Sequence, residues 1–78
     1  MADELELWHL RSRYSDYRCM RWPLGIGWEL RIYQDADLVV QELFPSEDSL
    51  LWRAEQLQKS MQRRGWNVVK HVRASSES

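Results

Sequence analysis

The sequence predicts an α+β fold: an antiparallel sheet of three or four strands in meander order, with one long helix packed on one face. Residues 46–64 have the apolar spacing and the terminal signals of a helix, and the segments before them alternate apolar and polar residues as strands do. Short turns join these segments, which favours hairpins. The chain has 78 residues, of which 44% are hydrophobic. We expect one domain over residues 1–73, with 74–78 as a flexible polar tail.

Residues 1–16 are compatible with two structures. Leu5 and Leu7 alternate with acidic residues, which indicates a strand. Leu7, Leu10 and Tyr14 also fit one face of a helix. We favour a strand that joins the sheet, or a short segment that covers it, and we expect a bend in the polar stretch that follows.

A strand is expected over residues 17–22, and residues 23–27 form a loop because they contain one proline and two glycines. The alternation places Arg18 and Trp22 on one face of this strand and Tyr17, Cys19 and Arg21 on the other.

The next strand gives the clearest alternation. Trp28, Leu30 and Ile32 share one apolar face and alternate with polar residues. After a short polar turn, residues 38–44 form the returning strand. Apolar residues fall on both of its faces, which a β-bulge or partial cover on both faces would explain.

The helix over residues 46–64 has the strongest local signals. Ser46 is suited to cap its first turn, acidic residues follow at the positive end of the helix dipole, and Gly65 is suited to close it. A short strand or extended segment is expected after Gly65. One apolar stripe should lie on the Trp28 face of the sheet. The stripe consists of Leu50, Leu51, Ala54, Leu57 and Met61.

Composition and motifs argue against several classes of function. The net charge is −1, and the single cysteine, Cys19, cannot form an intramolecular disulfide. His9 and His71 lack partners at metal-ligand spacing, so we interpret both as surface residues. We interpret Cys19 as a small, half-buried apolar residue. The acidic start does not resemble a signal peptide, and no apolar run could span a membrane. We expect no cofactor, no metal, no catalytic residues and a cytoplasmic location.

Protein binding is the function that the sequence favours. Trp52 lies almost opposite the apolar stripe on a helical wheel, so it is either exposed for a partner or covered by the N-terminal segment. The face of the sheet that the helix leaves uncovered would carry Arg31 and Tyr33. We expect a non-enzymatic interaction module that binds a protein partner or a second copy of itself through Trp52, Arg31 and Tyr33.

Nucleic-acid binding is the alternative function. Basic and aromatic residues alternate over Arg11–Trp22, and more cations follow the helix. Such a surface can hold phosphates and stack bases, provided that the strand and the C-terminal segment lie together. The residues in question are Arg11, Arg13, Tyr14, Tyr17, Arg18, Arg21, Lys70 and Arg73.

Overall fold

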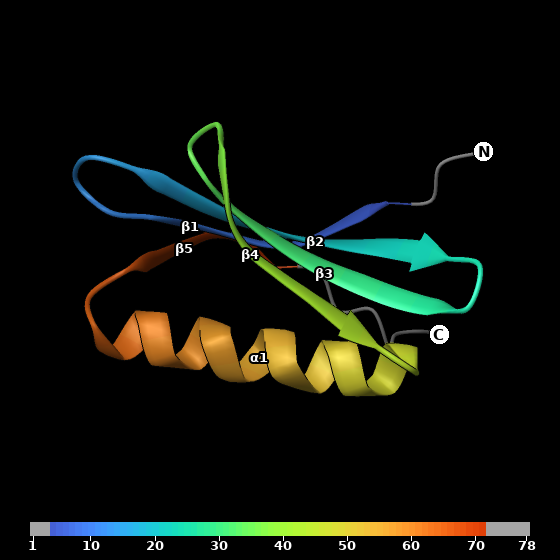
Figure 1. The fold of residues 1–78 in the computed structure, drawn as a ribbon. Helices are drawn as coiled ribbons and strands as arrows, with labels where there is room; N and C mark the ends of the chain where they lie inside the picture. Colours follow the sequence, from blue (N-terminus) through green and yellow to red (C-terminus); the bar gives the residue numbers. More distant parts are fainter. Residues whose placement is uncertain (1–3, 72–78) are drawn as a thin grey trace.

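The computed structural model describes residues 4–71 of the chain and confirms the α+β fold, with one helix packed on an antiparallel sheet (Figure 1). The elements are β1 (Leu5–Arg11), β2 (Asp16–Leu24), β3 (Gly27–Gln34), β4 (Asp37–Phe44), α1 (Glu47–Arg63) and β5 (Asn67–His71). The strand order is β4-β3-β2-β1-β5, and the first four strands follow one another as a meander. The expected tail at 74–78 lies outside the described residues.

The sheet has five strands, so the expected count of three or four was too low. The N-terminal segment is a full strand, as we favoured, and the segment after the helix returns to pair with its free edge. Pairing between β1 and β5 joins segments that are far apart in the sequence. Local alternation predicts that a strand exists, but it does not predict which neighbour that strand will find.

The turns between the strands are short. Gly25 and Ile26 alone connect β2 to β3, so these strands extend further into the expected loop than predicted. Asp35 begins the next turn with a positive φ of 55°, a conformation that aspartate tolerates better than most residues. Its backbone N–H donates to the carbonyl of Asp16 over 2.8 Å, which ties this turn to the start of β2.

The helix begins and ends as its local sequence predicts. The Ser46 hydroxyl accepts a hydrogen bond from the Ser49 N–H. At the other end Gly65 has a φ of 101°, and the N–H groups of Gly65 and Trp66 donate to the carbonyls of Gln62 and Met61. This pair of bonds is a Schellman motif, which satisfies carbonyls that the end of the helix would leave unpaired.

The core lies between α1 and the face of the sheet that it covers. Trp8 is fully buried there, and its indole Nε1 donates to the backbone carbonyl of Ala54 over 2.9 Å. Gln58 is also buried on α1, although its polarity excluded it from the predicted stripe. Trp28 is only half-buried, with the Arg21 guanidinium 4.8 Å from its ring centre. The buried apolar residues are Leu7, Trp8, Leu10, Cys19, Leu30, Ile32, Leu50 and Ala54.

Ion pairs join the helix to the sheet. Arg21 of β2 contacts Glu47 in the first turn of α1, and Arg53 of α1 donates to both carboxylate oxygens of Glu42 on β4. The Glu42 contact raises the pKa of Arg53. No helix within residues 4–71 is long and apolar enough to cross a membrane.

Candidate interaction surfaces

The helix covers one face of the sheet, and no helix of the described chain lies on the other face (Figure 1). Directly opposed residues of antiparallel strands point to the same face, so the pairing register shows which side chains this uncovered face carries. Trp22 is paired with Glu29, which is paired with Leu43. The neighbouring row of paired residues is Met20, Arg31 and Gln41, and the row after it is Arg18, Tyr33 and Leu38.

A polar and aromatic cluster, here called the Arg31 cluster, occupies the uncovered face; it consists of Trp22, Glu29, Arg31 and Gln41. The guanidinium of Arg31 lies 4.3 Å from the Trp22 ring centre and pairs with Glu29 at 2.7 Å. Glu29 is only 5% exposed, and its second oxygen accepts a hydrogen bond from the Gln41 amide. The buried carboxylate is therefore balanced by one cation and one amide, as a buried charge requires.

Arg31 and Tyr33 lie on this face together, as the sequence predicted. A hydrogen bond with Tyr33 is the main reason that the pKa of Arg31 is raised, and Glu29 adds to the effect. Arg31 is thus held by an aromatic ring, a carboxylate and a tyrosine. A fixed arginine loses less conformational freedom when a partner covers it than a mobile one would.

Trp52 is exposed. The sequence left open whether this side chain is exposed or covered by the N-terminal segment, and the structure shows that it is exposed. Its exposed fraction is 63%, and the N-terminal segment runs within the sheet, where it buries Trp8. Close by on the helix, Glu55 and Lys59 form an ion pair at 3.2 Å. Trp52 and the Arg31 cluster are consequently on opposite layers of the fold and form two separate surfaces.

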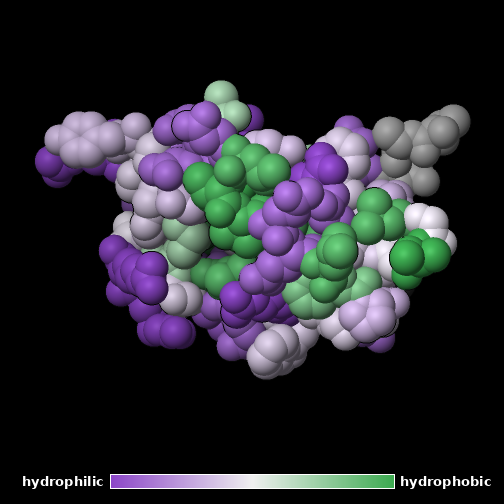
Figure 2. All heavy atoms as spheres, viewed as in Figure 1, coloured by the Kyte–Doolittle hydropathy of each residue, from purple (hydrophilic) through white to green (hydrophobic). Residues whose placement is uncertain are grey.

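The edge strand β4 carries a third surface that the sequence analysis did not single out. Leu43 is 71% exposed, and Leu38 and Val39 are also exposed. The register shifts by one residue between the Ile32 and Tyr33 pairs, so a bulge causes the mixed alternation of this strand. Figure 2 shows apolar surface over β4, crossed by a hydrophilic band. The signal in the sequence was the presence of apolar residues on both faces of the strand, because the helix covers only one face of the sheet.

The basic residues proposed for nucleic acid are divided between surfaces. Arg18 and Lys70 are both paired with His9 and so belong to the uncovered face. Tyr17 and Arg21 lie on the helix side. The Tyr17 ring contacts Trp66 with ring centres 4.6 Å apart, and Arg21 binds Glu47. Arg73 lies outside the described residues.

Arg11, Arg13 and Tyr14 lie together at the end of the β1–β2 hairpin. They line a pocket of about 230 Å³ with Ser12, Ser15, Asp16 and Asp35. The Arg13 guanidinium is 6.0 Å from the ring of Tyr14, which is 86% exposed. The Arg11 side chain donates a hydrogen bond of 2.8 Å to the carboxylate of Asp16. The carboxylates of Asp16 and Asp35 line the same pocket, so they oppose the binding of phosphate there.

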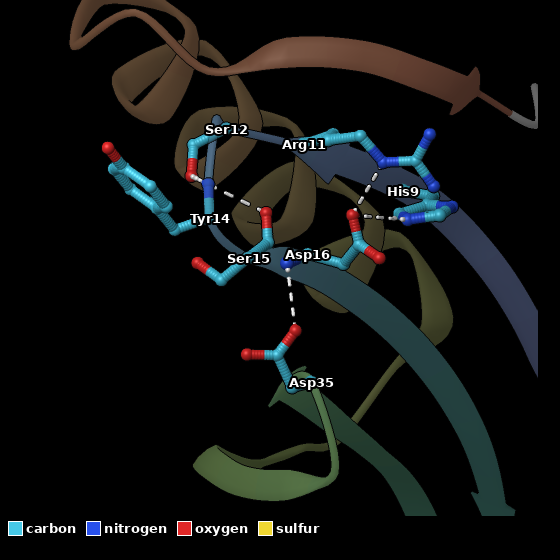
Figure 3. A network of polar contacts seen from close by, with 7 residues as sticks. All are labelled: His9, Arg11, Ser12, Tyr14, Ser15, Asp16 and Asp35. Atoms are coloured by element: carbon cyan, nitrogen blue, oxygen red, sulfur yellow. Dashed lines mark hydrogen bonds and ion pairs between the residues drawn. The ribbon is translucent and has the colours of Figure 1, made fainter.

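His9 was predicted at the surface and Cys19 as half-buried, and both predictions are wrong because both side chains are buried. His9 is only 6% exposed, and its Nε2 lies 3.4 Å from Asp16 Oδ1 (Figure 3). The hairpin brings the two side chains together because His9 is paired with Arg18 and Asp16 with Arg11 on the same face. Arg11, with a smaller contribution from His9, lowers the pKa of Asp16.

The polar residues at the end of the β1–β2 hairpin, here called the hairpin cluster, do not have the geometry of a catalytic site; they are His9, Arg11, Ser12, Ser15, Asp16 and Asp35. In Figure 3 Ser12 and Ser15 lie on the far side of Asp16 from His9, and the Ser12 hydroxyl is directed to the Ser15 carbonyl. Cys19, the chain's one thiol, is completely buried, and burial raises its pKa. Within residues 4–71, no group of three or more histidine, cysteine, aspartate and glutamate side chains could hold a metal ion.

No family model matches the chain, and no significant match was found among curated proteins or solved structures.

Proposed function

We propose that this chain is a non-enzymatic protein-interaction module that associates with itself. The observation that carries the proposal is the exposure of large apolar side chains away from the core, above all along β4, where Leu38, Val39 and Leu43 share one strand. Single exposed apolar residues are normal on a monomer. Larger exposed apolar surfaces, however, are typical of binding sites, and β4 carries three exposed apolar side chains along a free edge of the sheet.

The two surfaces foreseen from the sequence support this function. Trp52 on α1 and the stacked Arg31 on the sheet belong to residue types that are enriched at the centres of interfaces. Tyr33 lies beside Arg31 and adds a third such residue. Because the surfaces lie on opposite layers, one of them can bind a protein partner while another part of the molecule is engaged in self-association.

We propose the cytoplasm as the location of the protein. The free thiol of Cys19, buried in the core, fits a reducing compartment.

Sedimentation velocity over a wide concentration range tests self-association. We expect the mass to rise with concentration from 9.5 kDa to about twice that value, as for a dimer in exchange with its monomer. Tyr14→Ala is a matched control, since it removes an exposed ring outside the three surfaces and should leave the curve unchanged. A constant mass of 9.5 kDa at all concentrations would contradict the proposal. Salt-sensitive binding of mixed oligonucleotides in the same preparations would favour the nucleic-acid alternative instead.

A further inference from the structure

The outer edge of β4 has few of the features that usually prevent strand pairing. Edge strands are normally protected by lysine, proline, bulges or short length. β4 is eight residues long and contains no lysine, arginine or proline. Its bulge is at Val39, which has no partner on β3, and Val40–Phe44 keep a regular register with β3. Within residues 4–71 no strand pairs with this edge.

We propose that β4 pairs with β4 of a second copy of this chain, antiparallel and about a two-fold axis at Gln41. This inference rests on the proposed self-association and names the surface that carries it. With the axis at Gln41, the bulge residue Val39 lies opposite Leu43 of the second copy, and the same contact occurs twice. Both side chains are exposed in the single chain. The pairing therefore covers apolar surface that the monomer leaves in water.

Gln41 suits the position on the axis. It donates one amide hydrogen to Glu29. The amide has a second hydrogen and a carbonyl oxygen, so two copies can exchange a reciprocal pair of hydrogen bonds across the axis. A single polar pair at the centre of an apolar contact fixes the register, because any shift would leave the amides without each other.

The charges on β4 also permit pairing with a second copy. Glu42 is bound to Arg53 of its own chain. In the proposed register Glu42 lies opposite Val40, so like charges do not face each other, which would be destabilising. Asp37 is at the end of the strand, away from the axis. The strand is thus self-complementary, which is what a two-fold interface requires.

Pairing of β4 with the other edge, β5, fits less well. β5 has five residues, including Lys70, and its own pairing with β1 is irregular. A β4–β5 contact joins unlike surfaces and adds further copies without closing, whereas the β4–β4 contact ends at a dimer. A two-fold axis perpendicular to the sheet joins both sheets into one and puts both copies of α1 on the same face.

A disulfide tests the register directly. In antiparallel strands, opposed Cα atoms lie about 4.5–5.5 Å apart, which is within the range that a disulfide spans. Gln41→Cys should therefore form a covalent dimer with a mild thiol oxidant at low protein concentration. Gln56→Cys, at an exposed position on α1, is the matched control and should cross-link far less. The unmodified chain should remain monomeric on a non-reducing gel because Cys19 is buried.

A lysine on the edge tests the same contact without a new bond. Leu43→Lys should raise the dissociation constant of the dimer at least about tenfold, since it removes both apolar pairs and adds the charge that natural edges use. Val69→Lys, on the exposed part of β5, should leave the dissociation constant of the dimer unchanged. Because Leu43 is 71% exposed, we expect native circular dichroism for the variant.

The outcomes separate the inference from the function on which it rests. Cross-linking at residue 41 together with dissociation by Leu43→Lys supports the β4 dimer. A dimer that persists in Leu43→Lys and does not cross-link at residue 41 overturns the β4 interface but leaves self-association intact. A protein that is monomeric throughout overturns both.

Discussion

The ionisation of a single residue, Asp16, makes the stability of the fold depend on pH. The hydrogen bond from Arg11 is the main reason that the folded state lowers its pKa. Folding therefore favours the ionised carboxylate, and the resulting stability is present above the unfolded pKa of about 3.9 and lost as the pH falls through the folded pKa. Asp16→Asn should be less stable than the native chain at neutral pH, and this difference should shrink on acidification.

Urea unfolding at a series of pH values measures the effect. Arg11→Gln removes the main partner and should reproduce the same pH trend, while the double variant should differ little from either single one. If the difference in the free energy of unfolding between the native and Asp16→Asn proteins stays constant from neutral to acidic pH, ionisation of Asp16 does not stabilise the fold and the prediction is wrong.

At Gly27 the neighbouring backbone leaves no space for a side chain. This glycine begins β3 opposite the end of β4, and a Cβ built on it would lie 2.7 Å from the carbonyl oxygen of Phe44. An alanine there forces the two backbones apart, and we expect Gly27→Ala to lower the free energy of unfolding by about 1–3 kcal/mol. Gly25→Ala, in the same turn, is a matched control because nothing lies within 4 Å of its Cβ. Equal urea midpoints for the two variants would refute this prediction.

How well each element could be predicted depends on where its signals lie. The helix was expected over residues 46–64 and occurs over Glu47–Arg63, because the Ser46 cap and the Gly65 closure act within the segment itself. The alternation of β3 likewise identified Leu30 and Ile32 as core residues. The first and last strands were less certain, because each is stabilised by pairing with the other across most of the chain.

The same distinction applies to the candidate surfaces. Trp52 could be placed outside the core from helical spacing, but its exposure depended on the path of the N-terminal segment. The contact of His9 with Asp16 requires the β1–β2 register, which a one-residue slip would abolish. Strand alternation already separated Arg18 from Tyr17 and Arg21, and the tertiary structure adds the contacts of Tyr17 and Arg21 on the helix side.

At the scale of the whole molecule, Trp8 joins the two layers. Its ring fills the core, and its indole Nε1 donates to the carbonyl of Ala54 in the middle of α1. Trp8→Phe removes this bond and part of the ring volume, so we expect the free energy of unfolding to fall by about 2 kcal/mol. Trp52→Phe makes the same chemical change at an exposed site and should stay within about 0.5 kcal/mol of the native value.

Urea unfolding of both variants at one fixed protein concentration measures the contrast, because the stability of a self-associating protein depends on its concentration. The comparison also bears on function. If Trp52→Phe were as destabilising as Trp8→Phe, the outer ring would be part of the fold and no longer available to a partner. A large effect at Trp8 with almost none at Trp52 would instead mean that the chain maintains a large exposed aromatic ring that its own stability does not need.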